Sequence, residues 1–407
     1  MNSQTTTCCI TGGGPAGMML GLLLARAGVD VTVLEKHADF FRDFRGDTIH
    51  PSTLELMHEL GLLDAFLKVP HQKVSRLRAR FSGVPFFLAD FSHLPTVCKF
   101  IAMMPQWDFL NFLAEQGRRY PTFHLRKNAE VTDLLWEGDR VAGVRVDVPE
   151  GPAEIRAALT VGCDGRHSIV REKAGFKVQE LGAPMDVLWF SLSRKPTDDA
   201  ETMGVFDAGH IFVMIDRGDY WQCAFVISKG SMDQVRQRGI AAFGAEVGRV
   251  VPMLSDRSGE LTDWKQVHLL TVAVNRVEHW HRPGLLCIGD AAHAMSPIGG
   301  VGVNLAVQDA VAAANILAEP LHRSENADPL LAKVQERRMF PTRFTQRLQV
   351  IMQNTVIQGA LGSSGQLKAP LALRLIARFP FLRRIPARVL GIGVRPEHVR
   401  TVERRPA

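Results

Sequence analysis

The chain has 407 residues, enough to bury a sizeable core and to form roughly two domains. Its 46% hydrophobic and 22% charged residues are typical of a globular protein, and no apolar run approaches the roughly 20 residues of a membrane span. The net charge of +6 is concentrated in residues 370–407, which hold nine arginines against Glu397 and Glu403, and no aromatic residues alternate with these arginines as they would in a nucleic-acid-binding groove.

Cysteine and histidine spacing indicates a reducing compartment and no metal. The six cysteines form no C-x-x-C pair and mostly fall in predicted strands, so we expect buried thiols in a cytoplasmic protein. The amino terminus has no basic segment followed by an apolar signal core, which agrees with this expectation. His279 and His281 are the nearest candidates for a metal pair, but a solvated strand end explains them better, so no metal is predicted.

The first predicted elements are a strand, a glycine turn, a helix and a second strand within residues 7–35. The turn contains Gly12, Gly14 and Gly17 in a G-x-G-x-x-G pattern, with Pro15 and Ala16 inside it. Such glycines permit a sharp turn, a close approach of the backbone to a pyrophosphate and tight packing of the helix on the sheet. The free N–H groups and the dipole at the start of the helix favour a diphosphate.

An acidic residue follows the second strand where a ribose would lie. Glu35 comes 18 residues after Gly17, and Lys36, which follows it, is predicted to contact the cofactor as well. The Glu35 carboxylate can accept hydrogen bonds from ribose hydroxyls and would repel a 2′-phosphate. The pattern therefore predicts an adenosine diphosphate without that phosphate, as in NAD or FAD, and does not separate the two.

Mixed elements are predicted between residues 36 and 180. Ser52 and Glu55 have the spacing of a capping box at the start of a helix. A later strand ends in Asp164 and leads into another helix. The other predicted elements are strands or a ribbon at 74–102, a helix from 105 to about 119, and strands at 123–147 with a hairpin turn at 137–140.

An antiparallel sheet is predicted from residue 186 to 228. Its clearest strands are 211–215 and 220–227, joined by a turn at 216–219. Its large side chains could line a substrate pocket or pack a core, and the sequence does not separate these roles for Trp189, Phe212, Met214, Trp221 and Phe225.

A second glycine turn distinguishes the two candidate cofactors. A buried strand leads to Gly289 and Asp290, and an alanine-rich helix to about residue 318 is opened by a turn that holds Pro297, Gly299, Gly300 and Gly302. The N-terminus of this helix would face an acceptor that gains negative charge, as the N1/C2 carbonyl edge of a reduced isoalloxazine does. An NAD dehydrogenase has no need for this turn, so FAD is predicted.

Three predicted strands end in an acidic residue: Glu35, Asp164 and Asp290. Because ligands bind beyond the carboxyl ends of the strands in an open α/β sheet, these residues are expected to converge on one elongated ligand. With these motifs in this order, residues 6–345 resemble the single-component FAD-dependent aromatic hydroxylases, the family of para-hydroxybenzoate hydroxylase and the ubiquinone-pathway hydroxylases. The resemblance is carried by 12–17 with Glu35, by 163–165 with Ser168 and Arg171, and by 289–293 with Pro297, Gly299, Gly300 and Gly302.

The resemblance implies an α/β fold with a Rossmann-like three-layer FAD-binding domain, interleaved with a substrate domain of mixed or antiparallel sheet, plus a C-terminal helical segment. We accordingly assign residues 1–73, 100–180 and 270–325 to the FAD-binding domain, 74–99 and 181–269 to the substrate domain, and 326–407 to a basic helical segment. The resemblance also implies cofactor contacts: Arg45 near the flavin and its phosphates, Gln106 near the ribityl chain, Asp164 linked to both FAD and NAD(P)H, Asp290 at the ribityl hydroxyls, and residues from Gly299 to Asn304 beside the flavin ring. Structural roles stay open for Asp164 as a helix cap and for Arg45 as a solvated charge, and His293 is expected to be a packed or backbone-bonded histidine.

The chemistry implied by the resemblance is mostly that of the cofactor. NAD(P)H would bind transiently and reduce FAD, O2 would add at flavin C4a, and the hydroperoxide would transfer its distal oxygen to an aromatic or conjugated small molecule. Tyr120 and Tyr220 are the only tyrosines, and Tyr220 is the better candidate for a substrate contact. His50 and His210 are alternatives for a proton relay, and plain structural roles are open for all three candidates.

Other functions remain open on the same scaffold: a flavoprotein reductase, dehydrogenase or halogenase, although the W-x-W-x-I-P signature of flavin halogenases is absent, and a flavin-binding interaction protein without turnover. The expected partner is a small aromatic or lipophilic molecule and not a nucleic acid, and the oligomeric state is not indicated.

Residues 371–390 mix apolar residues with arginine and have two interpretations: contact with an acidic membrane surface, or a helical cap on the FAD domain. Pro380 and Pro386 favour the cap, because they limit a long amphipathic helix.

Overall fold

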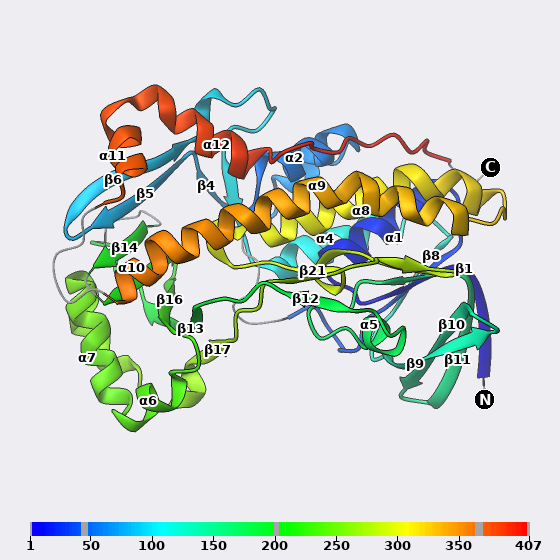
Figure 1. The fold of residues 1–407 in the computed structure, drawn as a ribbon, viewed down its shortest axis with the longest axis horizontal. Coiled ribbons are helices and arrows are strands. Elements are labelled where there is room, and N and C mark those ends of the chain that lie inside the picture. Colours follow the sequence, from blue (N-terminus) through cyan, green and yellow to red (C-terminus); the bar gives the residue numbers. More distant parts are fainter. Residues whose placement is uncertain (1, 42–47, 199–202, 208, 363–368, 405–407) are drawn as a thin grey trace.

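The computed structural model describes residues 2–41, 48–198, 203–207, 209–362 and 369–404, and two sheets dominate it (Figure 1). The first sheet has the strand order β19-β20-β11-β1-β2-β8, and β10 and β9 extend it from β11. β1 lies parallel to both β2 and β11, as in a dinucleotide-binding fold. Its strands are β1 (Asn2–Thr11), β2 (Val31–Leu34), β8 (Phe123–Arg126), β9 (Glu130–Glu137), β10 (Arg140–Val148), β11 (Gly151–Gly162), β19 (His281–Arg282) and β20 (Leu285–Cys287).

Helices cover one side of the parallel strands. α1 (Pro15–Arg26) packs against both α4 (Gln106–Gly117) and α8 (Val301–His322), and α9 (Asp328–Met352) lies on α8. In Figure 1 these helices lie above the sheet and the β9–β10–β11 ribbon lies at its lower end. By length and composition α8 could cross a membrane, which the sequence analysis missed, but most of it is buried in this core, so it is a core helix of the fold.

The second sheet has the order β17-β13-β16-β15-β14-β5-β6. Segments far apart in the sequence meet in it, because β5 pairs with β14 in parallel. The confirmed α/β class therefore comes with a separate, mainly antiparallel sheet, while the domain boundaries stay predictions. The strands are β5 (Arg76–Phe81), β6 (Val84–Asp90), β13 (Met185–Ser193), β14 (Met203–Asp207), β15 (His210–Asp216), β16 (Tyr220–Ser228) and β17 (His268–Leu270).

The two faces of this second sheet pack against different partners, because successive residues of a strand point to opposite faces. On the outer face, Trp221, Cys223 and Phe225 of β16 join a core with α6 (Met232–Gln237) and α7 (Ile240–Val250). On the inner face, Ala224 and Val226 join a cluster that includes Ile298 of the second glycine turn. The inner face therefore looks toward the first domain.

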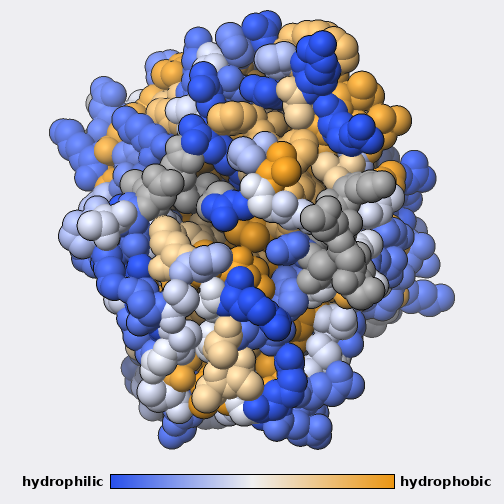
Figure 2. All heavy atoms as spheres, turned by 90° about the vertical axis from the view of Figure 1, so that its left-hand side faces the viewer, coloured by the Kyte–Doolittle hydropathy of each residue, from blue (hydrophilic) through white to orange (hydrophobic). Residues whose placement is uncertain are grey.

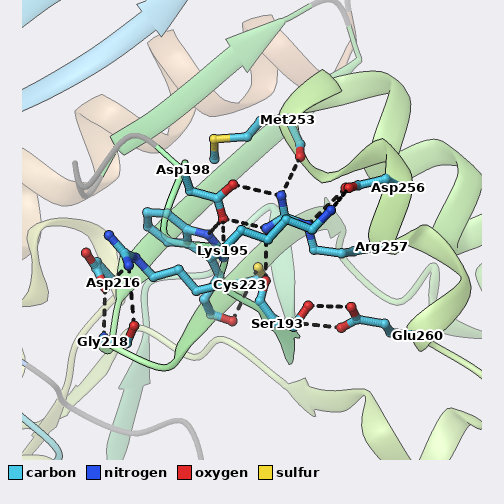
Figure 3. A network of polar contacts seen from close by, with 12 residues as sticks. Ser193, Lys195, Asp198, Asp216, Gly218, Cys223, Met253, Asp256, Arg257 and Glu260 are labelled. Carbon is cyan, nitrogen blue, oxygen red and sulfur yellow. Dashed lines mark hydrogen bonds and ion pairs between the residues drawn. The ribbon is translucent and has the colours of Figure 1, made fainter.

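A buried ion pair closes the outer layer of the second sheet (Figure 3). Arg257 donates from Nη1 to Asp198 Oδ2 at 2.5 Å and from Nη2 to Asp198 Oδ1 at 2.8 Å. The same guanidinium bonds the carbonyls of Ser193 and Met253, and Trp221 Nε1 donates to Asp198 at 2.9 Å. Because both charged groups are 4% exposed and hydrogen-bonded on several sides, the pair fixes the loop after β13 to the segment that follows α7.

The C-terminal segment makes two different contacts. α11 (Leu371–Arg378) and α12 (Arg384–Gly391) pack on β6 of the second sheet, and Leu390 of α12 also contacts Gly299 of the first domain, so the predicted cap lies across both. The chain then returns in extended form across the first domain: Val399 N donates to Glu59 Oε2 at 2.7 Å, and Arg404 N donates to Arg26 O at 2.8 Å. Figure 1 shows this strap running along the helices toward the C-terminus.

One local prediction was wrong. The predicted capping box does not form, because His50 is the N-cap residue of α2 and Ser52 lies inside the helix. Glu55 instead accepts a hydrogen bond from Val97 N at 2.9 Å. The remaining elements are β3 (Thr48–Ile49), α2 (Pro51–Glu59), α3 (Leu63–Phe66), β4 (Gln72–Val74), β7 (Ile101–Met103), α5 (Ile169–Lys173), β12 (Val178–Glu180), β18 (Asn275–Val277), β21 (His293–Ala294) and α10 (Gln358–Leu361).

The buried ion pair gives a stability prediction. Asp198→Asn keeps the shape of the side chain but leaves the Arg257 guanidinium buried without its counter-charge, so we expect the free energy of unfolding at pH 7 to fall by about 3–5 kcal/mol. Hydrogen bonds from Arg257 hold the pKa of the Asp198 carboxyl well below its ordinary value. The stabilisation is therefore complete above about pH 4, and it shrinks as the pH falls further.

Urea unfolding of both proteins between pH 7 and pH 2 measures this difference. Asp256→Asn is the matched control, because Asp256 contacts the same guanidinium but is half exposed, so a much smaller change is expected. Equal losses in the two variants would contradict a special role for the buried pair.

Candidate functional site

The first glycine turn is formed by backbone contacts that leave no room for a side chain at Gly12 or Gly17. Gly12 has φ +98°, and a Cβ there would lie 2.5 Å from Cys163 O. A Cβ on Gly17 would lie 2.0 Å from Gly12 O. A Cβ on Gly14 would meet nothing within 4 Å, so the open space of the turn lies at the N-terminus of α1, which begins at Pro15. A diphosphate fits this space, because the backbone can approach it closely there.

Glu35 lies directly beside this turn. Its Oε2 accepts a hydrogen bond from Gly13 N at 3.2 Å, and its Oε1 accepts one from His37 N at 3.0 Å. The carboxylate is nearly buried, so its position at the end of β2 is fixed. Lys36 points instead to the surface, where its Nζ lies 4.0 Å from Glu130.

The acidic loops after β11 and β20 are tied together by Arg171. Its Nη2 donates to Arg166 O at 2.7 Å, and its Nη1 lies 3.4 Å from Ala291 O. Asp290, at the end of the second loop, keeps a partly exposed carboxylate 4.0 Å from Arg166 Nη2. The arginine of the second motif therefore has a structural function, which is to hold the loops after β11 and β20 side by side.

Asp164 helps to cap the start of α5, as one of the two interpretations expected, while Ser168 is the N-cap residue of this helix. Ser168 Oγ donates to its Oδ1 at 2.5 Å, and Val170 N donates to its Oδ2 at 3.1 Å, at the start of α5. Burial raises the pKa of the Asp164 carboxyl. The cap fixes the carboxylate at the carboxyl end of β11, and its contact with FAD or NAD(P)H stays a prediction.

The loop at Gly289 rests on a buried ionic network. Gly289 N donates to Asp309 Oδ2 at 3.1 Å, the His293 Nε2 lies 2.5 Å from the same oxygen, and Arg338 Nε donates to Oδ1 at 2.8 Å. Burial alone would raise the pKa of Asp309, but His293 and Arg338 outweigh it and lower the pKa. His293 is thus a packed histidine, as expected, with a carboxylate as its partner. A Cβ on Gly289 would lie 3.1 Å from Ala16 Cβ, so this loop and the start of α1 are in contact.

The second glycine turn is enclosed by two other segments. Gly299 and Gly300 have φ +76° and +62°, and a Cβ on them would lie 2.8 Å from Leu390 Cδ2 and 2.2 Å from Thr48 Oγ1. Thr48 Oγ1 also donates to Gly300 O at 2.8 Å. Pro297 begins the turn and α8 begins at Val301, so Gly302 lies in the first turn of the helix, and the free N–H groups of the helix start face the same region.

Asn304 connects this turn to the start of α2. Its Oδ1 accepts hydrogen bonds from His50 N at 2.9 Å and Thr53 Oγ1 at 2.7 Å, and its Nδ2 donates to Thr48 O at 3.1 Å. The Asn304 amide is therefore used within the protein, where it ties the start of α8 to the start of α2, and its predicted contact with the flavin stays a prediction.

Two glutamines of α9 hold the chain that precedes the second turn. Gln349 accepts from Ser296 N at 3.1 Å and donates to Ser296 O at 2.9 Å and Ile298 O at 3.1 Å. Gln346, three residues earlier, donates to Asn275 O at 2.8 Å and Ala294 O at 3.2 Å. Neither glutamine was predicted as a site residue, because a polar residue in a long helix is usually solvent-exposed and only its distant partner shows otherwise.

The three candidate catalytic residues lie in different places. His50 is fully buried, its Nδ1 lies 2.6 Å from Leu390 O, and its Nε2 has no partner among the described residues. Burial lowers the pKa of His50 to about 4, so the imidazole is neutral at pH 7 beside the second glycine turn. Tyr220 shares the inner face of β16 with Ala224 and Val226. His210 lies with its Nε2 2.9 Å from Glu246 of α7, on the outer side, so the structure does not bring it together with the other two.

The region between the second turn and the inner face is apolar. Trp189 and Val213 belong both to the cluster of Ile298 and to the cluster of Leu390. Phe212, Met214, Trp221 and Phe225, which the sequence could not assign, all pack in the outer core. Of the five aromatic and methionine candidates, Trp189 alone lies on the face toward the glycine turn.

A polar pair at the edge of this region was not foreseen. The Arg217 guanidinium, in the β15–β16 turn, lies close enough to Asp108 of α4 to oppose the effect of burial, which raises the pKa of Asp108. Arg217 Nε also donates to Gln222 Oε1 at 2.8 Å. Gln106 begins the same helix, and Trp107 contacts Phe41 with ring centroids 4.8 Å apart. Arg45 lies outside the described residues.

Comparison with known proteins agrees with this site. A family model described as an FAD binding domain matches residues 5–348. The 6-methylpretetramide 4-monooxygenase of Streptomyces rimosus is 32% identical over 391 residues, which cover 94% of this chain and 92% of that protein.

Two solved structures extend the comparison. The anhydrotetracycline hydroxylase OxyS of Streptomyces rimosus has a TM-score of 0.74 at 25% identity and covers 95% of this chain and 76% of its own. The p-nitrophenol 4-monooxygenase PnpA of Pseudomonas putida DLL-E4 has a TM-score of 0.77 at 20% identity, with 98% and 100% covered, and this likeness concerns the fold alone. Since the family model spans most of the chain and a monooxygenase relative matches it almost end to end, the chain belongs to the single-component FAD-dependent aromatic hydroxylases and is an FAD-dependent monooxygenase.

Proposed function

We propose that this monooxygenase uses NAD(P)H and O2 to hydroxylate an aromatic polyketide or a related conjugated compound. The observation that carries the proposal is the apolar surface formed by Trp189, Val213, Ile298 and Leu390 between the second glycine turn and the inner sheet face. The names of two relatives support it: one is a 6-methylpretetramide 4-monooxygenase, and OxyS is an anhydrotetracycline hydroxylase. Buried free thiols at all six cysteines support a cytoplasmic location.

Different residues of the chain would bind the cofactor and the substrate. The N-terminus of α1 would hold the FAD diphosphate, Glu35 the adenosine ribose and Asp290 the ribityl chain. When bound, FAD supplies electron transfer from the nicotinamide and activation of O2. The chain itself excludes water through the apolar surface and orients the ring of the substrate, and Tyr220 and the neutral His50 are its candidates for accepting or donating a proton there.

Oxygen incorporation tests the reaction class. The purified holoenzyme is incubated with NADPH or NADH, isotopically labelled O2 and a panel of polycyclic phenols, and products are identified by mass spectrometry. We expect one substrate class to accelerate nicotinamide oxidation and to gain one labelled oxygen atom. A reduced product without label would favour a reductase. A halogenated product in the presence of bromide would favour a halogenase, and no oxidation of either nicotinamide would favour a non-catalytic flavoprotein.

The glutamines of α9 give a matched pair for the cofactor site. Gln349→Leu leaves the backbone groups of Ser296 and Ile298 buried without partners, which costs about 1–3 kcal/mol for each group and loosens the second glycine turn. We expect FAD affinity to fall about tenfold or more in fluorescence titrations. Gln346→Leu removes similar bonds one helical turn away from the glycine turn, so it should lower the melting temperature without this loss of affinity. Equal FAD dissociation constants in the two variants would contradict the role of Gln349.

The two sheet faces give a matched pair for the substrate site. Tyr220→Phe removes a hydroxyl on the inner face, and a lost hydrogen bond to a phenolic substrate should raise KM about tenfold, since such a bond is worth roughly 1–1.5 kcal/mol. His210→Asn changes a polar group on the outer face and should leave both kcat and KM within about twofold. Steady-state kinetics with the best substrate from the screen measure both KM values. A larger increase of KM in His210→Asn than in Tyr220→Phe would contradict a substrate contact of Tyr220.

A further inference from the structure

The C-terminal helices expose a cluster of large apolar side chains. Leu371, Phe381 and Ile385 are 61–69% exposed, and Leu375 and Phe379 are each 43% exposed. The rings of Phe379 and Phe381 are in contact, with centroids 6.1 Å apart. Single exposed apolar residues are ordinary, but five within fifteen residues of chain form a surface that calls for a partner.

Arginines without acidic neighbours surround this cluster. Residues 337–396 contain eleven lysines and arginines and no aspartate or glutamate. The exposed arginines of the helices are not paired with a carboxylate among the described residues: Arg374, Arg378, Arg384 and Arg388. We call these four arginines and the five apolar residues the interfacial patch.

The inner side of the same helices is fixed to the protein. Ala387 is fully buried in a cluster with Phe91 and Met103, and Leu390 packs on Gly299 while its carbonyl meets His50 Nδ1. Arg383 and Arg78 both lie over the ring of Phe87 of β6, at 5.1 Å and 4.8 Å. The interfacial patch is therefore the outer face of a docked element, and its exposure is not that of a loose tail.

The views of the molecule agree on where the patch lies. α11 and α12 lie beside β6 at the end of the molecule that carries the second sheet (Figure 1). Figure 2 faces this end, and hydrophobic and strongly hydrophilic atoms lie next to one another along its upper part. Apolar and cationic side chains thus share one surface.

We propose that the interfacial patch docks on an anionic lipid surface. Apolar side chains enter the boundary between headgroups and acyl chains, and the arginine guanidinium groups bind lipid phosphates in a bidentate manner. A second copy of this chain is a poor occupant, because two such faces carry only positive charge and repel each other. Because α12 packs on the second glycine turn, docking would place the substrate domain at the surface in which an apolar substrate dissolves.

Vesicle co-sedimentation of the full-length holoenzyme tests the docking. Vesicles of phosphatidylcholine with about one third phosphatidylserine are compared with pure phosphatidylcholine, at low and high salt. We expect binding to the anionic vesicles alone, and we expect salt to weaken it, because screening acts on the arginine–phosphate attraction. Phe381→Ser with Ile385→Ser, and separately Arg378→Gln with Arg384→Gln, should each reduce binding about tenfold or more.

Matched controls replace exposed residues of the same kinds elsewhere on the protein. Val402→Ser with Leu269→Ser removes exposed apolar side chains, and Arg249→Gln with Arg323→Gln removes exposed arginines. These controls should bind as the wild type does, and all variants should keep their FAD content and melting temperature.

Three outcomes would overturn the proposal. The first is no binding to either vesicle, and the second is equal losses in patch and control variants. The third is a concentration-dependent dimer in light scattering that the patch variants abolish, because it would make a second copy the occupant of the patch.

Discussion

The structure depends on close backbone approach at two glycine turns. At the first turn, Gly12 and Gly17 bring the start of α1 against the end of β1 and the loop after β11, with no space for a Cβ. At the second, Gly300 meets Thr48 in the same way. Because both turns place the free N–H groups of a helix start at the carboxyl edge of one sheet, they create two electropositive ends between which one elongated, negatively charged cofactor can lie.

The acidic residues around this edge are held by bonds that leave their positions fixed. Glu35 is held by two backbone N–H groups, Asp164 by a helix start, and the Gly289–Asp290 loop by the buried Asp309 beneath it. Removing one member of such a network costs more free energy than a single hydrogen bond contributes to stability, because a buried polar group then loses its partner. The positions of the carboxylates that are predicted to face the cofactor are therefore set by the protein itself.

Local sequence patterns predicted the parts of the site that lie within one segment. The strand–turn–helix at Gly12, the acid at Glu35 and the helix start after Gly300 depend on spacing along the chain, and the structure shows each element where expected. Contacts between distant segments could not be predicted in this way. Asn304 and His50 are 254 residues apart, and Gln349 meets Ser296 across 53 residues, so no short-range pattern signals either pair. The predicted capping box at Ser52 shows that a short-range pattern can also be misleading. Its Glu55 accepts a hydrogen bond from the distant Val97 N instead of from the helix start.

The second turn also shows why the cofactor site needs more of the chain than its motifs. The family match ends at residue 348, yet Gln349 holds Ser296 and Ile298, and Leu390 packs on Gly299. Since α12 carries Leu390 and also packs on β6 of the second sheet, one helix contacts both the turn that would face the flavin and the sheet that would face the substrate. A displacement of α12 would change both walls together, so the C-terminal segment sets the geometry of the region in which the two ligands would meet.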